Sequence, residues 1–382
     1  MDFDLSEEQT MLKDSLERLL ADRYGFEQRN RHLASPEGWS ADMWGQYAEM
    51  GLMALPFAEE DGGLGGGPVE TMIVMEALGK SLALEPYWPT VVVGGGFVAA
   101  GGSTEQKAEI IPLVAEGSLK LAFAQVEKNS RYDLHHVETT ARRNGSGYVL
   151  SGAKGVVIGG DSADRLIVTA RTAGDTRDEA GIGVFVVDAK AEGVSRRGYA
   201  MQDGQRAAEI TFENVNVPAD AVLGDPEGGL PLVRAVVDRA IAALCAEAVG
   251  VMGEMHAQTV DYLKVRKQFG VAIGQFQSLQ HMAVDMFVAH EQARSIVHYA
   301  TMMAASEDAT ERRRAIHAAK AEVGRDGRLV GENAIQLHGG VGMTMEYAVG
   351  HYFKRMTMID LTFGDHDHHL RALAAEGGLF QD

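Results

Sequence analysis

The spacing of apolar residues changes twice along this chain of 382 residues, and this change constrains its fold more than any other feature. Up to about residue 120, apolar side chains such as Leu12, Leu16 and Leu19 recur at the spacing of helices. Short segments rich in β-branched and aromatic residues follow, and from about Gly228 the helical spacing returns over long stretches. Helices, then strands, then helices predict an α+β architecture and not an alternating βα fold.

The N-terminal region is expected to be helical. Ser6, followed by two glutamates, has the pattern of a helix start. Further helices are predicted at about residues 41–50, 69–78 and 104–116. The Gly94–Gly96 cluster followed by Ala99 superficially matches the dinucleotide-binding pattern G-x-G-x-x-A. That motif needs a strand in front of it, and here the surroundings are helical, so we interpret the glycines as a loop.

The central region is expected to be a β domain. Gly, Asn and Asp clusters separate short segments at intervals typical of an antiparallel barrel or sandwich. The strands are predicted at Leu121–Gln125, Tyr148–Ser151, Arg165–Arg171, Gly183–Asp188 and Glu209–Phe212. Asn144-Gly145 has the sequence of a hairpin turn.

The C-terminal region is expected to be a four-helix bundle, because long helical patterns follow one another with brief connections. These patterns cover about residues 230–253, 255–267, 278–306 and 311–338, with a short helix at the end. The predicted domains are an N-terminal helical domain at residues 1–120, a central β-barrel or sandwich at 121–228 and the bundle at 229–382.

Charge and cysteine content narrow the range of partners. The formal net charge of −19 argues against nucleic acid or an anionic membrane surface as the main partner. No apolar run reaches the roughly 18 residues needed to cross a bilayer. The single cysteine, Cys245, excludes a disulfide framework and suits the cytoplasm. The Asp365–His369 tract lacks the H-E-x-x-H spacing of a helical zinc site, so we expect no metal centre.

Three motifs in the bundle region could hold a phosphorylated ligand. They are Arg266 at the end of one predicted helix, Phe276-Gln277 at the start of the next, and Gln336-Leu337-His338-Gly339-Gly340 at the end of a third. Arginine forms paired charged hydrogen bonds with phosphate, and adjacent glycines leave backbone that a ligand can approach closely. Taken singly, each motif is also an ordinary feature of a helix end.

Taken in order, these and other motifs resemble the acyl-CoA dehydrogenase family, flavoproteins that oxidise acyl-CoA thioesters to enoyl-CoA. The resemblance covers nearly the whole chain. The matching segments are Phe3–Gln9, Gly51-Leu52 with Glu59–Gly65, Glu76–Gly79, Gly102–Lys107, Ser151–Lys154 and Asn216-Val217-Pro218 with Leu223-Gly224. The family fold is a helical domain, a β domain and a four-helix bundle, the order that the periodicity predicts.

Both places where this family carries its general base are altered. The base removes the α-proton of the thioester while a hydride leaves the β-carbon for the flavin. The usual Y-E-G-T segment corresponds to Thr362–Asp365, with Phe363 at the glutamate position. The alternative L-D-x-E-R segment corresponds to Val237–Ile241, with Ala240 at the base position. Neither side chain can accept a proton, and a positioned base contributes about 10²–10⁴ in rate.

The β-domain segments that contact the flavin in this family are altered too. T-E-P-G-A-G-S-D corresponds to Val126–Asp133, where Val126 replaces the threonine and Tyr132 the serine. In the segment that corresponds to K-x-W/F-I-T, Val156 replaces the aromatic residue and Ile158 the threonine. The cofactor-binding residues of the bundle are kept, namely Arg266, Phe276, Gln277, Gln336, Gly339 and Gly340.

In this family each FAD is held by the β domain of one subunit and the bundle of its neighbour. The resemblance therefore implies that this chain completes the FAD site of a paralogous acyl-CoA dehydrogenase subunit in an α2β2 hetero-oligomer. Small subunits of heteromeric members, such as those of pimeloyl-CoA dehydrogenase or of enzymes for steroid side chains, are the most similar. The partner would supply the base, an acyl-CoA would be the substrate, and electron-transfer flavoprotein would be the acceptor.

Two other interpretations stay open. The chain could be a self-sufficient homotetrameric acyl-CoA dehydrogenase with a relocated base. Asp365, two residues past Phe363, is one candidate for that base, and Glu247, two helical turns past Ala240, is another. The chain could instead be a scaffold that binds acyl-CoA or flavin without redox chemistry.

Overall fold

The computed structural model describes residues 5–379, so Phe3 and Asp4 of the N-terminal motif lie outside the described residues. The described residues form two compact units that do not follow the order of the chain. Of the described residues, unit 1 contains 5–31, 68–83 and 241–379, and unit 2 contains 32–67 and 84–240.

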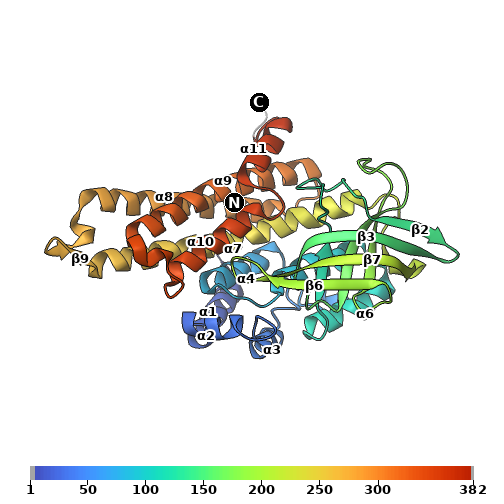
Figure 1. Ribbon diagram of the computed structural model, residues 1–382, viewed down its shortest axis with the longest axis horizontal. Coiled ribbons are helices and arrows are strands. Elements are labelled where there is room, and N and C mark those ends of the chain that lie inside the picture. The colour runs from blue at the N-terminus through green and yellow to red at the C-terminus, as the bar shows by residue number, and fades with distance from the viewer. Residues whose placement is uncertain (1–4, 380–382) are drawn as a thin grey trace. The chain divides into compact units, whose positions relative to one another are not determined.

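Unit 2 contains an eight-stranded sheet with the strand order β6-β7-β3-β2-β4-β5-β8, in which β1 pairs with β4 (Figure 1). The strands are β1 Leu121–Ala124, β2 Thr140–Asn144, β3 Gly147–Ile158, β4 Arg165–Arg171, β5 Ile182–Asp188, β6 Val194–Ala200, β7 Arg206–Pro218 and β8 Val222–Leu223. All five predicted strands are present, which confirms the β region. The edge strand β6 escaped prediction because most of its residues are exposed or half-buried, so it has no apolar alternation.

The hairpin prediction at Asn144-Gly145 is confirmed. Strands β2 and β3 pair from Asn144 opposite Gly147, and Gly145 takes a φ of 58°, in the left-handed region that glycine enters readily. The core of the sheet is a cluster of fully buried apolar side chains, including Leu150, Leu166 and Ile210.

The helices that lie wholly within unit 2 are short. They are α3 Ala41–Glu49, η1 Glu59–Asp61, the π-helix η2 Trp88–Gly95, α5 Gly96–Gly101, α6 Thr104–Ala115 and η3 Ala219–Ala221. The loop predicted at Gly94–Gly96 is wrong, because η2 runs directly into α5 there. A Cβ on Gly94 would collide with Leu121 and one on Gly95 with Phe57. These glycines let a buried helix pack closely against its neighbours, a requirement that periodicity does not reveal.

Unit 1 is helical. Its elements are α1 Glu7–Arg23, the first part of α2 Phe26–Leu33, α4 Pro68–Ser81, most of α7 Leu230–Val265, β9 Lys267–Gln268, β10 Val271–Ala272, η4 Ile273–Gln275, α8 Gln277–Met303, α9 Ala309–His338, η5 Gly339–Met343, α10 Ala348–Leu361 and α11 His366–Ala375. Helix α9 packs against α8, α10 and α11 (Figure 1).

One predicted helix break is wrong. Helix α7 is continuous across Gly253, so the four long C-terminal helices are α7, α8, α9 and α10. A Cβ on Gly253 would lie 3.1 Å from Nε2 of His290 on α8, so this glycine permits close helix packing and does not end the helix.

The predicted start of the first helix is confirmed. Ser6 is the N-cap of α1, its hydroxyl accepts a hydrogen bond from Gln9 N, and the Gln9 side chain completes the capping box. Among residues 5–379, no helix combines the length and the apolar character that a membrane span requires.

Candidate functional site

The C-terminal ends of α7 and α9 and the start of α10 meet at one end of the bundle. The ring of Tyr262, in the last turn of α7, stacks on that of His338 with centroids 4.5 Å apart, and Tyr347, the N-cap of α10, lies 5.0 Å from the same imidazole. His338 Nδ1 donates to the carbonyl of Ala334 at 2.8 Å, and burial lowers the pKa of the ring. This aromatic cluster fixes the place where the predicted ligand-binding motifs come together.

Arg266 follows α7 directly, at the base of the β9–β10 hairpin. Its carbonyl accepts a hydrogen bond from Ile273 N at 2.8 Å, which closes the hairpin. The side chain is exposed, and within residues 5–379 its guanidinium makes no ion pair or hydrogen bond. At the tip of the hairpin Phe269 is 92% exposed, and its ring lies 6.2 Å from Phe276 in a T-shaped contact. A charged group and two aromatic rings are thus presented to the surroundings.

Gly339 and Gly340 have different local reasons to be glycine. Gly339 caps α9 with φ 64° and ψ −146°, a conformation reserved for glycine. Gly340 has no atom within 4 Å of the place where a Cβ would lie. Nothing in the described chain requires glycine at 340, and its bare backbone is open to a ligand from outside.

The six bundle residues predicted to bind the cofactor share one end of the bundle and are all exposed. They are Arg266, Phe276, Gln277, Gln336, Gly339 and Gly340. The unpaired guanidinium and the open glycine backbone fit a planar, phosphorylated ligand such as a flavin dinucleotide.

The two positions predicted to correspond to the family's base, Phe363 and Ala240, are both constrained by their surroundings. Phe363 lies in the loop between α10 and α11 with a φ of 59°, which is uncommon for a bulky residue. Ala240 is fully buried on α7, and its carbonyl accepts a hydrogen bond from Trp88 Nε1 at 3.0 Å.

Both candidate replacement bases are engaged in structural interactions. Asp365 is the N-cap of α11, and its Oδ1 accepts a hydrogen bond from His368 N at 2.8 Å. Glu247 forms a two-fold ion pair with Arg355, at 2.6 and 2.7 Å, and both side chains are buried. Each carboxylate already stabilises the fold where it stands, which does not favour either as a mobile proton acceptor.

The β-domain segment predicted to correspond to the family's flavin contact contains a buried ion pair. Lys154 Nζ lies 2.7 Å from Glu127 Oε1 and also donates to Thr169 Oγ1 at 3.1 Å. Burial alone would raise the pKa of Glu127, but Lys154 and Thr139 hold it below its usual value. The pair is internal and offers no donor to a ligand.

The residues that replace the flavin-facing side chains are apolar. Val156 is 47% exposed and lies at a bulge of β3 with a φ of 48°, a strained conformation for a β-branched residue. Val126 accepts a backbone hydrogen bond from Gly155 at 2.8 Å, so the two segments still touch. Neither Val126 nor Val156 carries a hydroxyl group that could hydrogen-bond a ligand.

The histidines of the Asp365–His369 tract contact neighbouring residues around α11. His366 Nδ1 lies 3.1 Å from Asp360 Oδ2, and His369 contacts both the Phe363 carbonyl and His317. Throughout the described part of the chain, no group of three or more His, Cys, Asp or Glu side chains is placed to hold a metal ion.

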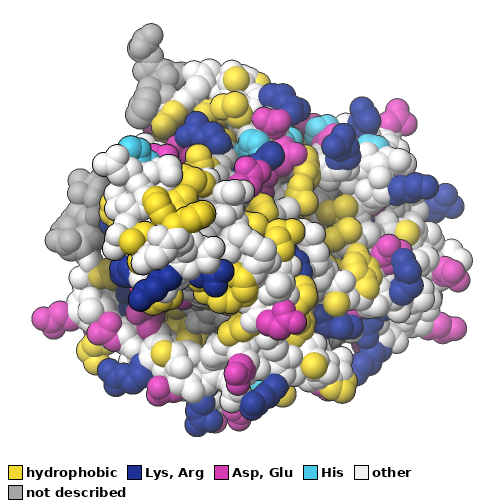
Figure 2. All heavy atoms as spheres, turned by 60° about the vertical axis from the view of Figure 1, so that its left-hand side comes forward, with side chains coloured by type: hydrophobic (Ala, Val, Ile, Leu, Met, Phe, Trp, Pro, Cys, Tyr) yellow, Lys and Arg dark blue, Asp and Glu magenta, His cyan; other side chains and the backbone are white. Residues whose placement is uncertain are grey.

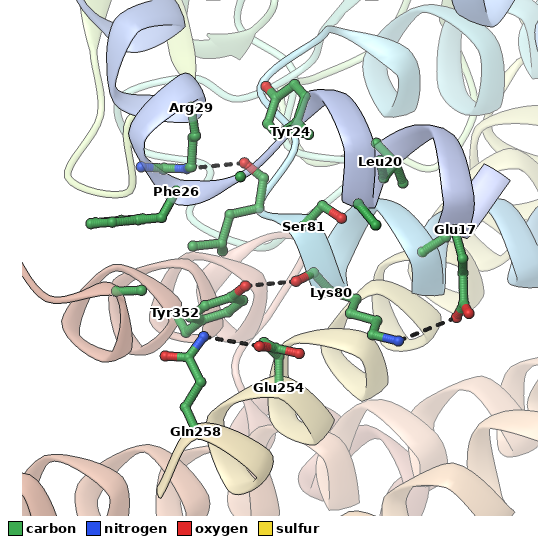
Figure 3. Close-up of a pocket in the computed structure, with 15 residues that line it drawn as sticks. Glu17, Leu20, Tyr24, Phe26, Arg29, Lys80, Ser81, Glu254, Gln258 and Tyr352 are labelled. Atoms are coloured by element: carbon green, nitrogen blue, oxygen red, sulfur yellow. Dashed lines mark hydrogen bonds and ion pairs between the residues drawn. The ribbon is translucent and has the colours of Figure 1, made fainter. Parts of the chain in front are cut away.

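A cavity of about 380 Å³ in unit 1 lies among α1, α2, α4, α7 and α10 (Figure 3). Its polar groups satisfy one another: Lys80 pairs with Glu17 at 3.5 Å, and Gln258 donates to Glu254 at 2.9 Å (Figure 3). None of the predicted site residues lines this cavity.

Comparison with known proteins finds the same family over nearly the whole chain. Models of the N-terminal, middle and C-terminal domains of acyl-CoA dehydrogenases match residues 6–118, 122–215 and 227–378. The chain belongs to the acyl-CoA dehydrogenase family. The family is FAD-dependent, and the fold and the relatives identify the chain as an oxidoreductase of the acyl-CoA dehydrogenase type.

Three relatives illustrate the similarity. The protein named "Probable acyl-CoA dehydrogenase fadE25" of Mycobacterium bovis is 31% identical over 80% of this chain and 79% of its own length. The solved structure named "FAD complex of PigA" matches with a TM-score of 0.91 and 26% identity, covering 99% of this chain and 100% of that chain. A variant of the Tcur3481-Tcur3483 steroid ACAD matches with a TM-score of 0.87 and 29% identity, covering 97% of each chain.

Proposed function

We propose that this acyl-CoA dehydrogenase is the base-lacking subunit of a hetero-oligomer. In this proposal the chain lends its bundle residues to the FAD site of a paralogous subunit, which supplies the general base and the β-domain contacts. We take its domains to be residues 1–120, 121–228 and 229–382. A location in the cytoplasm is proposed because its single cysteine, Cys245, is free and buried.

The observation that carries the proposal is the contrast between unpaired and engaged polar groups. Arg266 is exposed without a partner in the described chain, whereas Asp365 caps a helix and Glu247 is held by Arg355. A chain that acted alone would need a carboxylate free to take the α-proton, because a positioned base contributes about 10²–10⁴ in rate.

FAD, when bound, accepts the hydride that leaves the β-carbon of the acyl-CoA. In the proposed complex, the guanidinium of Arg266 binds a phosphate of this cofactor, and Gly339-Gly340 lets the ligand approach the backbone at the end of α9. Gln277 and Gln336 add amide groups that can both donate and accept hydrogen bonds.

A second subunit also needs an apolar surface to pack on, and α8 offers one. Val284, Phe287 and Val288 follow one another around the exposed side of this helix and are 56%, 49% and 46% exposed. An apolar groove of about 760 Å³ continues this surface along α8 past Ile296 and Tyr299. Figure 2 shows hydrophobic side chains lying between charged groups on the face that turns forward from the left of Figure 1. Exposed apolar surface of this kind is typical of protein interfaces.

The names of relatives support the same assembly. The Tcur3481-Tcur3483 steroid ACAD is named as a pair of chains, and this points to a paralogous acyl-CoA dehydrogenase as the partner and to an acyl-CoA ester as the substrate. Electron-transfer flavoprotein is the proposed acceptor.

The test is to express the chain alone and together with a candidate paralogous acyl-CoA dehydrogenase subunit. Alone, the chain should purify with little flavin and should not reduce a dye acceptor when a panel of acyl-CoA thioesters is added. The co-purified complex should carry FAD and be active. A flavin-saturated, active homotetramer of this chain, inactivated by Asp365→Asn, would overturn the proposal.

A further inference from the structure

The loop that joins α10 to α11, Leu361–Asp365, is held by a buried lysine of α9. Lys320 is fully buried, and its Nζ donates to the carbonyl oxygens of Asp360 at 2.6 Å and of Gly364 at 2.7 Å. These two carbonyls lie on either side of Leu361–Phe363. One ammonium group therefore ties the two ends of this turn together and at the same time caps the carboxyl end of α10.

A pair of histidines holds the middle of the same loop. His369 Nε2 lies 3.1 Å from the carbonyl oxygen of Phe363, and because a carbonyl can only accept, this nitrogen carries a proton. In the neutral ring Nδ1 is then an acceptor, so it receives a hydrogen bond from His317 Nδ1, 2.8 Å away. Burial lowers the pKa of both imidazoles, which keeps the two rings neutral.

This arrangement is costly to maintain. Burial lowers the pKa of Lys320 to about 8, and the nearby carboxylates of Asp360 and Asp365 offset this only in part, although a buried charge needs compensation. The loop itself holds Phe363 at a φ of 59° and Gly364 at 118°. A bulky residue in the left-handed region persists only where its surroundings fix it, and such strain is concentrated at functional sites.

We propose that Lys320 and His369 are positioning residues that fix the α10–α11 loop, so that residue 363 keeps one place and one backbone conformation whatever its side chain is. The chain has then lost the side chain of the base but kept the structure that positions it. This inference rests on the proposed function in one respect, the assignment of residue 363 to the family's base position.

It follows that a glutamate at position 363 is a competent base. Its carboxylate takes the α-proton of an acyl-CoA thioester: the C–H bond breaks, an O–H bond forms, and the electron pair stays on the thioester as an enolate. Return of a proton to the carbon restores the substrate, so this half-reaction needs no oxidant and can be followed as exchange with D2O.

The first measurement is amide hydrogen exchange of the loop in the full chain. Lys320→Met should speed exchange at residues 361–365 about tenfold to a hundredfold, as expected when hydrogen bonds to a charged group are lost. Amides of α8 should not change. Lys320→Arg should keep much of the protection, and Lys264→Met, at an exposed lysine of the same unit, is the matched control. His369→Leu, which keeps both bonds of Lys320 but removes those of His369 to the Phe363 carbonyl and to His317, is the second variant if Lys320→Met does not fold.

Unchanged loop protection in the folded Lys320→Met or His369→Leu variant would overturn the positioning role. The second measurement separates this from the proposed function: deuterium incorporation at the α-carbon of butanoyl-CoA in D2O. Phe363→Glu should exchange the α-protons at least about tenfold faster than the wild type, and adding Lys320→Met should remove this gain. A protected loop without exchange in Phe363→Glu would contradict the assignment of position 363 to the base and leave the positioning role in place.

Discussion

Two polar regions of unit 1 differ in whether their side chains form hydrogen bonds within the described chain. At the end of the bundle, Arg266 and Gln336 are exposed and make no side-chain hydrogen bonds within residues 5–379. Around the α10–α11 loop, Lys320 of α9 and His369 of α11 are buried, and they donate hydrogen bonds to the carbonyl oxygens of Gly364 and Phe363. Polar groups that a chain leaves open serve something outside it, whereas buried and satisfied groups define its own geometry. The contrast separates what the chain offers to a partner from what it keeps for its own structure.

The largest expected effect comes from testing whether the chain contains a general base of its own. Alone, the chain should turn over acyl-CoA about 10²–10⁴ times more slowly than the hetero-complex, because it lacks a positioned proton acceptor. Asp365→Asn in the complex should leave the rate of flavin reduction, followed by stopped-flow absorbance, within about twofold of the wild type. Loss of flavin reduction in this variant would place the base in this chain after all.

The next largest expected effect is on the free energy of unfolding, and it comes from the buried ion pair between Glu247 and Arg355. Glu247→Gln leaves Arg355 buried without its counter-charge, so the free energy of unfolding should fall by about 3–5 kcal/mol. Urea denaturation followed by circular dichroism measures this loss. The control is Glu332→Gln, which breaks the exposed pair with Arg328 and should cost less than about 1 kcal/mol. Equal costs for the two variants would show that Glu247 is not a structural partner of Arg355.

The histidine pair makes the folded state sensitive to acid. Burial is the largest cause that lowers the pKa of His317, to about 4, and the charges of His368 and Arg313 add to it. An unfolded histidine titrates near 6.5. Between these two pKa values the unfolded chain binds more protons than the folded one, so the contribution of His317 to stability is complete above pH 6.5, falls as the pH drops below 6.5 and is lost below about pH 4. The expected loss from His317 is about 3 kcal/mol. The pH dependence of urea midpoints measures it, and His317→Gln should flatten the profile over this range.

Arg266 tests the proposal that the exposed polar groups at the end of the bundle bind a ligand. Arg266→Gln in the hetero-complex should weaken FAD retention about tenfold to a hundredfold, the effect of one lost hydrogen bond to a charged group. Flavin release during dialysis, followed by fluorescence, measures this. Because the guanidinium has no partner in the described chain, the unfolding midpoint of the chain alone should not change. A variant that unfolds more easily but retains FAD normally would make Arg266 a structural residue.

Much of the fold follows from local sequence signals. Ser6 caps α1 as its pattern predicts, and the strand predicted at Arg165–Arg171 has the bounds of β4. Gly253 and Gly94 were misread because their roles depend on residues distant in the chain, His290 and Leu121. A glycine that ends an element and a glycine that lets two elements touch look the same in a sequence.

In the candidate site, too, local features could be predicted from the sequence, whereas contacts between residues distant in the chain could not. The six bundle residues named by the resemblance lie at helix ends and are exposed, and their role in binding FAD stays a prediction. The resemblance could not tell that Glu247 is bound by Arg355, 108 residues away. Lys320 was missed altogether, although a lysine placed directly between the small apolar residues Ala319 and Ala321 of α9 is a signal for a buried charge.

The smallest expected effect concerns Gly340, and it sharpens the contrast between the chain alone and the complex. No atom lies within 4 Å of a Cβ placed there, so Gly340→Ala should change the unfolding free energy of the isolated chain by no more than about 0.5 kcal/mol. Gly339→Ala forces a side chain into a conformation with φ 64° and ψ −146°, and should cost about 1–3 kcal/mol. If the backbone at 340 is kept bare for a cofactor, the methyl group should instead weaken FAD binding to the hetero-complex, measured by isothermal titration. Equal FAD affinity of wild type and Gly340→Ala would mean that the cofactor does not approach this backbone.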